Sequence, residues 1–370
     1  MSRYRHPKRR IRWDRSDDDD WQPYDDIDEA VIVEPVLKRK KPDHQDFTAN
    51  SINDLIKLGF LYDSTINNSN LLQKLFQLIP SLMKLDSMIG MESIKKQLTD
   101  QIIYFIQGYH ENDLDGNFIN TVLLGSPGTG KTEVSYILAG IYKSLGFLST
   151  DKVTLAKKSD FIANYLGQTV NKTQKTLEKA KGGVLVIDEV YAFGSRDSES
   201  NADSYGKEAV DTINQYLSEN RKDIVCIVIG YKKDVEECFF SLNKGLKRRF
   251  PFTYEIEDYT PLELKDIFIY QVRKNNWNIL NTESIDIQAF LTESFRIHKT
   301  HFKNNGGSTE EIFFKCKMTQ SKKMFGKEPN LVEKYSLSLD VIKETFEEYI
   351  KIKDKNKLEL LSSPPPGMYG

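Results

Sequence analysis

The sequence predicts an α/β fold, in which helices cover both faces of a parallel sheet, followed by a smaller all-helical domain. Short apolar runs alternate with amphipathic helical segments between residues 121 and 256, and they read TVLLG, VTLAK, GVLVI, IVCIVIG and FTYEI. Strands that are apolar throughout and separated by helices are typical of a parallel sheet buried on both faces. From Pro261 to about residue 355 the strand-like runs stop and helical periodicity remains.

The chain divides into regions by composition and periodicity. Residues 1–48 alternate basic and acidic blocks, and we expect a disordered charged tail because such blocks bury little apolar surface. The basic stretches KRRIR and KRKK leave a docking arm or a nuclear address as alternatives. A helical segment at 49–84 precedes the α/β domain at 85–260, and the helical domain at 261–355 follows. Residues 356–370 contain SSPPPGMYG and are expected to form a flexible Pro/Gly tail.

Composition narrows the class of protein. The formal net charge of -2 over 370 residues provides no global basic field, so a nucleic-acid partner is not favoured. Cys226, Cys238 and Cys316 form no C-x-x-C pair, which argues against a zinc site and a disulfide framework. No apolar run is long enough to span a membrane, and the charged N-terminus is unlike a signal peptide. We therefore expect a cytoplasmic protein without a membrane partner.

Residues 121–132 read TVLLGSPGTGKT, a strand that leads directly into a phosphate-binding loop. Gly125, Gly130, Lys131 and Thr132 match the pattern G-x-x-x-x-G-K-[ST], and the flanking strand and helix disfavour a chance match. Backbone N–H groups of such a loop surround phosphates, with Lys131 on the β- and γ-phosphates and the Thr132 hydroxyl on Mg²⁺. The expected cofactors are therefore ATP and Mg²⁺. The residues expected to bind them are Gly125, Ser126, Pro127, Gly128, Thr129, Gly130, Lys131, Thr132 and Glu133.

A second acidic signal follows the apolar run at 182–190, which reads GGVLVIDEV. Asp188 would lie at the carboxyl end of a buried strand, where open α/β sheets bind ligands, and would hold Mg²⁺ through water. Glu189 would orient and deprotonate the attacking water. The alternative is that two acids merely end a strand. Downstream of a phosphate loop, the pair favours hydrolysis over switching or small-molecule phosphorylation.

Longer segments carry a more specific signal, and they include DFIANYLGQTVNKTQKTLEKAKGGVLVIDEVYAF, YGKEAVDTINQYLSENR, IVIGYKKDVEECF, NKGLKRRFPF and EDYTPLELKDIF. Across about residues 85–325 the chain resembles AAA+ ATPases, in the branch of red-type rubisco activase (CbbX) and stage V sporulation protein K. The resemblance implies a P-loop NTPase sheet in the order 5-1-4-3-2, a C-terminal helical lid, and ATP hydrolysis by a homo-oligomeric ring, usually a hexamer. Similar proteins occur in large DNA viruses, and if this chain is viral we expect it in the host cytoplasm.

The resemblance also implies roles for residues outside the phosphate loop. Ile89 and Gly90, in LDSMIGMESIKKQL, match the segment that lines the adenine pocket. Tyr165, Leu166 and Gly167 match an aromatic–hydrophobic–glycine pore loop that grips extended polypeptide in the axial channel. The alternative for the tyrosine is that it packs under the sheet.

The family carries R-x-R before Phe250, where this chain has Lys247, Arg248 and Arg249. Arg249 is the leading candidate for an arginine finger that reaches the nucleotide of the neighbouring subunit, with Arg248 beside it. A solvated basic cluster is the alternative. Lys247 keeps the charge but lacks the planar fork, so a pair of arginines in this pattern is incomplete. Tyr231 stands at the first sensor position, where its phenol could bond water or phosphate, or simply pack.

The second sensor, an arginine that opens a lid helix, has no counterpart in NNGGSTEEIFFK. Aligning this segment places Glu310 or a neighbour at the expected position. Ser308 and Glu311 have the spacing of a capping box, which predicts that the helix begins at Ser308. We therefore expect a lid helix to begin here, as in the family, but without the positive charge of the second-sensor arginine.

These signals favour a ring-forming ATPase that remodels an unidentified protein client or protein complex. No H-E-x-x-H motif or evident Ser/His/Asp arrangement indicates proteolysis. A nucleic-acid motor or loader is the alternative from another class, supported only by the terminal basic blocks and lysine-rich helices. An ATP-dependent assembly scaffold with little turnover is a third hypothesis, which the missing second sensor supports.

Overall fold

The structure, a computed structural model, describes residues 48–65, 70–112, 118–163, 165, 167–194, 201–282, 284–328 and 330–362. The charged tail predicted for residues 1–48 lies outside the described residues except for Thr48, and so does Leu166 of the predicted pore loop. Within the described ranges, no helix combines the length and the apolar character that crossing a membrane requires.

A parallel sheet forms the centre of the α/β domain, with its strands in the order β2-β3-β4-β1-β5. The strands are β1 (Thr121–Gly125), β2 (Val153–Ala156), β3 (Val184–Ile187), β4 (Val225–Gly230) and β5 (Phe252–Ile256). This is the expected order 5-1-4-3-2 read from the opposite edge, so the predicted fold class is confirmed. The register aligns Thr121 with Ile227 on one neighbouring strand and with Phe252 on the other.

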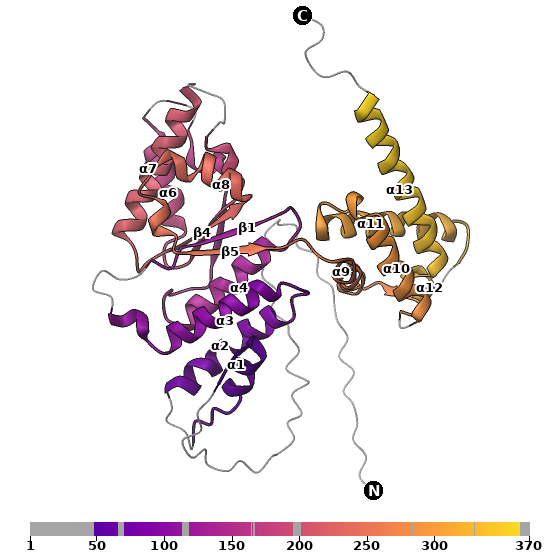
Figure 1. Cartoon of the computed structure of the whole chain (residues 1–370), viewed down its shortest axis with the longest axis horizontal. Coiled ribbons are helices and arrows are strands. Elements are labelled where there is room, and N and C mark those ends of the chain that lie inside the picture. The colour runs from indigo at the N-terminus through magenta and orange to yellow at the C-terminus, as the bar shows by residue number, and fades with distance from the viewer. Residues whose placement is uncertain are drawn as a thin grey trace, which may run out of the picture. The chain divides into compact units, whose positions relative to one another are not determined.

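Two layers of helices enclose the sheet, as Figure 1 shows. One layer contains α1 (Ile52–Gly59), α2 (Asn70–Asp86), α3 (Glu92–Ile106) and α4 (Lys131–Ser144). The other contains α6 (Thr169–Lys179), α7 (Asn201–Glu219) and α8 (Lys232–Cys238). Because side chains alternate along a strand, Leu123 packs in the core of the first layer and Val122 in that of the second. Shorter turns are η1 (Tyr109–Asn112), α5 (Lys158–Phe161), η2 (Val190–Ala192), η3 (Phe240–Leu242) and η4 (Lys247–Arg249).

The helical lid follows β5 and starts with a capping box. The Thr260 hydroxyl accepts from the Glu263 N–H, the Glu263 carboxylate accepts from the Thr260 N–H, and Pro261 takes the first helical position. The lid helices are α9 (Pro261–Lys274), α10 (Ile285–Ile297), η5 (Lys299–His301), α11 (Asn305–Met324), α12 (Leu331–Lys334) and α13 (Leu339–Ser362). A short parallel pair, β6 (Asn278–Ile279) with β7 (Ser336–Leu337), adds strand to a domain that was expected to be all-helical.

Two helix ends differ from the sequence predictions. α13 continues to Ser362, past the expected end at residue 355, because helix-forming residues continue almost to the run of three prolines. α11 begins at Asn305, so the predicted start at Ser308 is wrong. Ser308 is buried inside the first turns, and Glu311 accepts from Tyr349 and Lys353 of α13 instead of capping the helix.

The N-terminal helical segment is part of the main core. Leu72, Leu75, Leu78 and Leu82 of α2 are buried in the same cluster as residues of α3 and α4. α2 therefore packs as an extra helix on the first layer and supports α4, the helix that follows the phosphate loop.

Leu78→Ala tests this role of α2, because Leu78 is fully buried. We expect the free energy of unfolding, measured by chemical denaturation, to fall by about 2–5 kcal/mol through lost burial and the residual cavity. Gln77→Ala, at the exposed neighbouring position, should change it by less than about 0.5 kcal/mol. Equal, small effects of the two substitutions would contradict the packing of α2 into the core.

Candidate nucleotide-binding site

The phosphate loop joins β1 to α4 in the conformation that its glycines permit. Gly128 has a φ of 70° and Gly130 a φ of 84°, both in the left-handed region that other residues rarely adopt. Gly130 precedes the first residue of α4, so the N-terminus of that helix faces the loop. The Thr129 hydroxyl donates to the Ser126 carbonyl at 2.8 Å and fixes the loop from inside.

Lys131 folds its ammonium back onto the loop. Its Nζ donates to the carbonyls of Gly125 at 2.9 Å and Ser126 at 2.6 Å. Burial lowers the pKa of Lys131, and the negative charges of Asp188 and Asp258 oppose that shift. These interactions place both carboxylates in the electrostatic field of the lysine, so the loop, the end of β3 and the segment after β5 form one site.

The paired acids lie directly after β3, as predicted. Asp188 Oδ1 accepts from the Glu189 N–H at 2.8 Å, which orients the Asp188 carboxylate. Glu189 has a φ of 56°, an uncommon conformation for a residue with a long side chain. Such backbone strain concentrates at functional sites.

Lys157 is a site residue that the sequence reasoning missed. Its Nζ lies 2.9 Å from Glu189 Oε1, and the hydrogen bond to this carboxylate raises the pKa of Lys157. The strand order could have identified Lys157, because Ala156 and Ile187 are paired at the ends of the neighbouring strands β2 and β3. Residues that follow these two strands must therefore be neighbours at the carboxyl edge of the sheet.

Tyr231 and Asp258 extend the site along the same edge. Tyr231 follows β4 and is half exposed, and Asp258 follows β5. Burial raises the pKa of Tyr231, and the carboxylates of Asp234 and Asp258 raise it further. The sequence EDYTP shows that acidic residues follow the last strand, but it does not show that Asp258 lies near Lys131.

The segment expected to hold adenine lies against the end of the phosphate loop. A Cβ at Gly130 would lie 3.0 Å from the Met91 Cε atom and 3.3 Å from that of Met88. Between these methionines, Ile89 is partly buried and Gly90 has a left-handed φ of 66°. Gly90 has no room for a side chain, because a Cβ there would overlap the Glu263 carboxylate of the lid.

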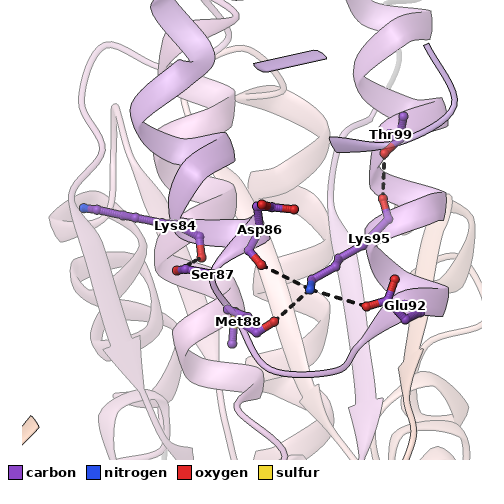
Figure 2. Close-up of polar contacts among 7 residues, drawn as sticks. All are labelled: Lys84, Asp86, Ser87, Met88, Glu92, Lys95 and Thr99. Carbon is purple, nitrogen blue, oxygen red and sulfur yellow. Dashed lines mark hydrogen bonds and ion pairs between the residues drawn. The ribbon is translucent and has the colours of Figure 1, made fainter. Parts of the chain in front are cut away.

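Lys95 stabilises this segment, as Figure 2 shows. Its Nζ donates to the main-chain carbonyls of Met88 at 2.8 Å and Asp86 at 3.3 Å, and pairs with Glu92 at 3.6 Å. The Lys95 side chain is only 13% exposed, so its charge interacts with these oxygens at the C-terminus of α2. Sequence reasoning did not identify this lysine.

The arginines lie at the opposite, amino edge of the sheet. The Arg249 carbonyl accepts from Asn120 just before β1, and η4 ends shortly before β5. β1 alone spans five residues, or roughly 16 Å at about 3.3 Å per residue, so these arginines lie far from the phosphate loop of their own chain.

The two arginines differ in their surroundings. The Arg249 guanidinium donates to Ser218 Oγ and the Gly245 carbonyl, and lies 5.8 Å from the centre of the Phe118 ring. Arg248 is exposed. Arg249, the leading candidate for the arginine finger, is thus bonded within its own chain. The exposed Arg248 is better placed to reach a neighbouring subunit.

Tyr165 lies in the loop between α5 and α6. Its side chain is 71% exposed, which is inconsistent with packing under the sheet. Gly167, at a φ of 78°, has no atom within 4 Å of the position a Cβ would take. At the second-sensor position, Glu310 is exposed, whereas Asn305 and Gly306 of α11 contact the phosphate loop.

The chain is similar in sequence to known proteins. Residues 121–257 match the model of the ATPase family associated with various cellular activities (AAA). The putative cfxQ-like protein R730 of Acanthamoeba polyphaga mimivirus is 36% identical over 302 residues, 81% of this chain and 71% of that protein. CbbX of Cereibacter sphaeroides is 31% identical over 54% of this chain and 63% of its own length. Stage V sporulation protein K of Bacillus subtilis is 30% identical over 56% and 64%. The chain is an ATPase that belongs to the AAA family, in the branch of the cfxQ-like proteins.

Proposed function

We propose that the protein hydrolyses Mg-ATP as a ring of identical subunits, a hexamer, and uses the energy to remodel a protein client. One observation carries the assembly: the phosphate loop and the paired acids lie at the carboxyl edge of the sheet, and the arginines at its amino edge. A site that needs an arginine must then receive it from another subunit, as a ring of subunits facing the same way provides.

The residues present fit a magnesium–nucleotide complex. Gly128 and Gly130 give the phosphate loop the left-handed backbone that lets N–H groups turn toward a phosphate. The Lys131 ammonium is bonded to the carbonyls of Gly125 and Ser126, and it can exchange these carbonyls for phosphate oxygens. Thr132 and Asp188 would hold Mg²⁺, which neutralises phosphate charge when bound. Glu189 would accept the proton of the attacking water, and it must then exchange its Lys157 partner for that water.

The loop around Tyr165 supports a protein client. An exposed aromatic ring beside a glycine with unobstructed surroundings offers apolar contact to extended polypeptide without selecting its side chains. The net charge of -2 does not favour nucleic acid as the partner.

Glu189→Gln tests the catalytic assignment and captures the client. We expect hydrolysis to fall by about 10²–10⁴-fold, because the base is lost, while Mg-ATP still binds. Mass spectrometry of material held by this variant in ATP should identify a protein. Glu347→Gln, on the exposed face of α13, is the matched control and should hydrolyse ATP at the normal rate. Recovery of nucleic acid alone would contradict the remodelling proposal.

Mixed rings test the arginines. In a ring of Arg248→Ala alone every site lacks the arginine, and in a ring of Glu189→Gln alone every site lacks the base, so each variant alone should be nearly inactive. Together they should regain activity, because an Arg248→Ala subunit receives an arginine from a Glu189→Gln neighbour. The measurement is the ATPase rate of the mixture against the sum of the separate rates. A mixture that merely equals this sum would exclude a shared site.

Tyr165→Ala tests the pore loop. We expect the amount of client processed per ATP hydrolysed to fall by roughly two- to tenfold, because one aromatic contact accounts for about 0.5–1.5 kcal/mol. Tyr270→Ala, which removes a comparably exposed tyrosine from α9, should keep the ratio. Equal losses in the two variants would remove the special role of Tyr165.

A further inference from the structure

The first residue of α11 is buried against the phosphate loop. Asn305 is 2% exposed and has a φ of 48°, a left-handed conformation that asparagine tolerates better than most residues. Its side-chain Nδ2 donates to the Pro127 carbonyl at 3.3 Å and to Asp258 Oδ1 at 3.0 Å. Its Oδ1 accepts from the Tyr259 N–H at 3.0 Å. Every polar group of this amide therefore has a partner, and the partners belong to two different segments.

Two further hydrogen bonds reach the loop from the lid side. The Gly306 N–H donates to the Gly128 carbonyl at 3.0 Å, and the Tyr259 hydroxyl donates to the Thr129 carbonyl at 3.1 Å. Three consecutive carbonyls of the loop thus accept from Asn305, Gly306 and Tyr259. The approach is close, because a Cβ at Gly128 would overlap the Asn304 carbonyl.

The start of α11 is in turn fixed to α9. Gln271 Nε2 donates to the Gly306 carbonyl at 2.9 Å, and the Thr309 hydroxyl donates to Gln271 Oε1 at 2.9 Å. A displacement of the first turn of α11 therefore involves α9, the helix that begins the lid.

The carbonyls bonded to the lid and the N–H groups of the phosphate loop belong to the same peptide units. The carbonyls of Pro127, Gly128 and Thr129 share planar peptide units with the N–H groups of the following three residues. Those N–H groups are the ones that a phosphate loop directs at its ligand. Turning an N–H toward a phosphate tilts the carbonyl of the same unit, and these carbonyls are the atoms to which the lid is bonded.

We infer that Asn305 is a positioning residue that couples the phosphate loop to the lid, so that phosphate binding changes the packing of α9 and α11. The inference rests on the proposed binding of Mg-ATP at this loop. Communication between nucleotide and lid would then run through hydrogen bonds from Asn305 and Gly306 to the carbonyls of the phosphate loop. Glu310, at the second-sensor position, is exposed.

Asn305→Gly tests the coupling, because glycine keeps the left-handed backbone and removes only the amide side chain. The matched control is Asn304→Ala, since the adjacent Asn304 is exposed. Hydrogen exchange of the full chain is measured with and without Mg-ATP. In the unsubstituted protein and in Asn304→Ala, nucleotide should change exchange in both the loop at 125–130 and the lid at 261–274 and 305–313. In Asn305→Gly the loop should still respond, and the lid response should be clearly reduced, because only the bonds of Gly306 and Tyr259 to the loop remain.

Kinetics provide a second readout. The rate constant kcat of Asn305→Gly should fall by about tenfold, as expected for a lost buried hydrogen-bond set, while KM changes by less than about threefold. Asp258→Ala removes one acceptor of the same amide without altering α11, and it should also weaken the lid response. It serves as the test variant if Asn305→Gly fails to fold. A full lid response in the variant that folds would overturn the inference. A loop that does not respond to Mg-ATP in the unsubstituted protein would instead refute the proposed function.

Discussion

The parallel arrangement of the strands determines most of this protein's chemistry. Because β1, β3, β4 and β5 run in one direction, the residues that follow them meet at one edge, where the phosphate loop, Asp188 and Tyr231 lie. The same pairing brings Lys157 to Glu189 at 2.9 Å from the end of β2. The helices on both faces support this edge: α2 and α3 hold the segment beside Gly130 through Lys95, and α4 begins directly at the loop.

In the proposed function, the same constraint leaves the site without an arginine of its own chain. Strands that gather the acids at the carboxyl edge put η4, with Arg248 and Arg249, at the amino edge. A guanidinium at one edge serves a phosphate at the other edge only across a subunit boundary. The lid is different, because α11 contacts the loop of its own chain through Asn305 and Gly306. The phosphate loop is thus bonded to the lid through its carbonyls, and in the proposed ring its nucleotide would contact an arginine of a neighbouring subunit.

The sequence predicted the sheet and the loop because these depend on local signals: apolar runs, glycine spacing and paired acids. The strand order was implied only by the resemblance to AAA+ ATPases. The sequence did not predict Lys157 or Asp258, whose roles arise only when separate strands end side by side. The α11 start was misassigned because Ser308 and Glu311 match a capping box locally, whereas contacts to Pro127 and Gly128 bring residues 305–307 into the helix. For Arg249, the sequence showed the charge but not the hydrogen bonds that hold it within its chain.

In the proposed mechanism, each nucleotide site is completed by a second copy of the chain. The most direct test is the ATPase rate per subunit, measured across protein concentration while sedimentation reports the assembly state. We expect the rate per subunit to be near zero for monomers and to rise cooperatively as the ring forms. A constant rate per subunit, including at concentrations where only monomers sediment, would contradict this mechanism.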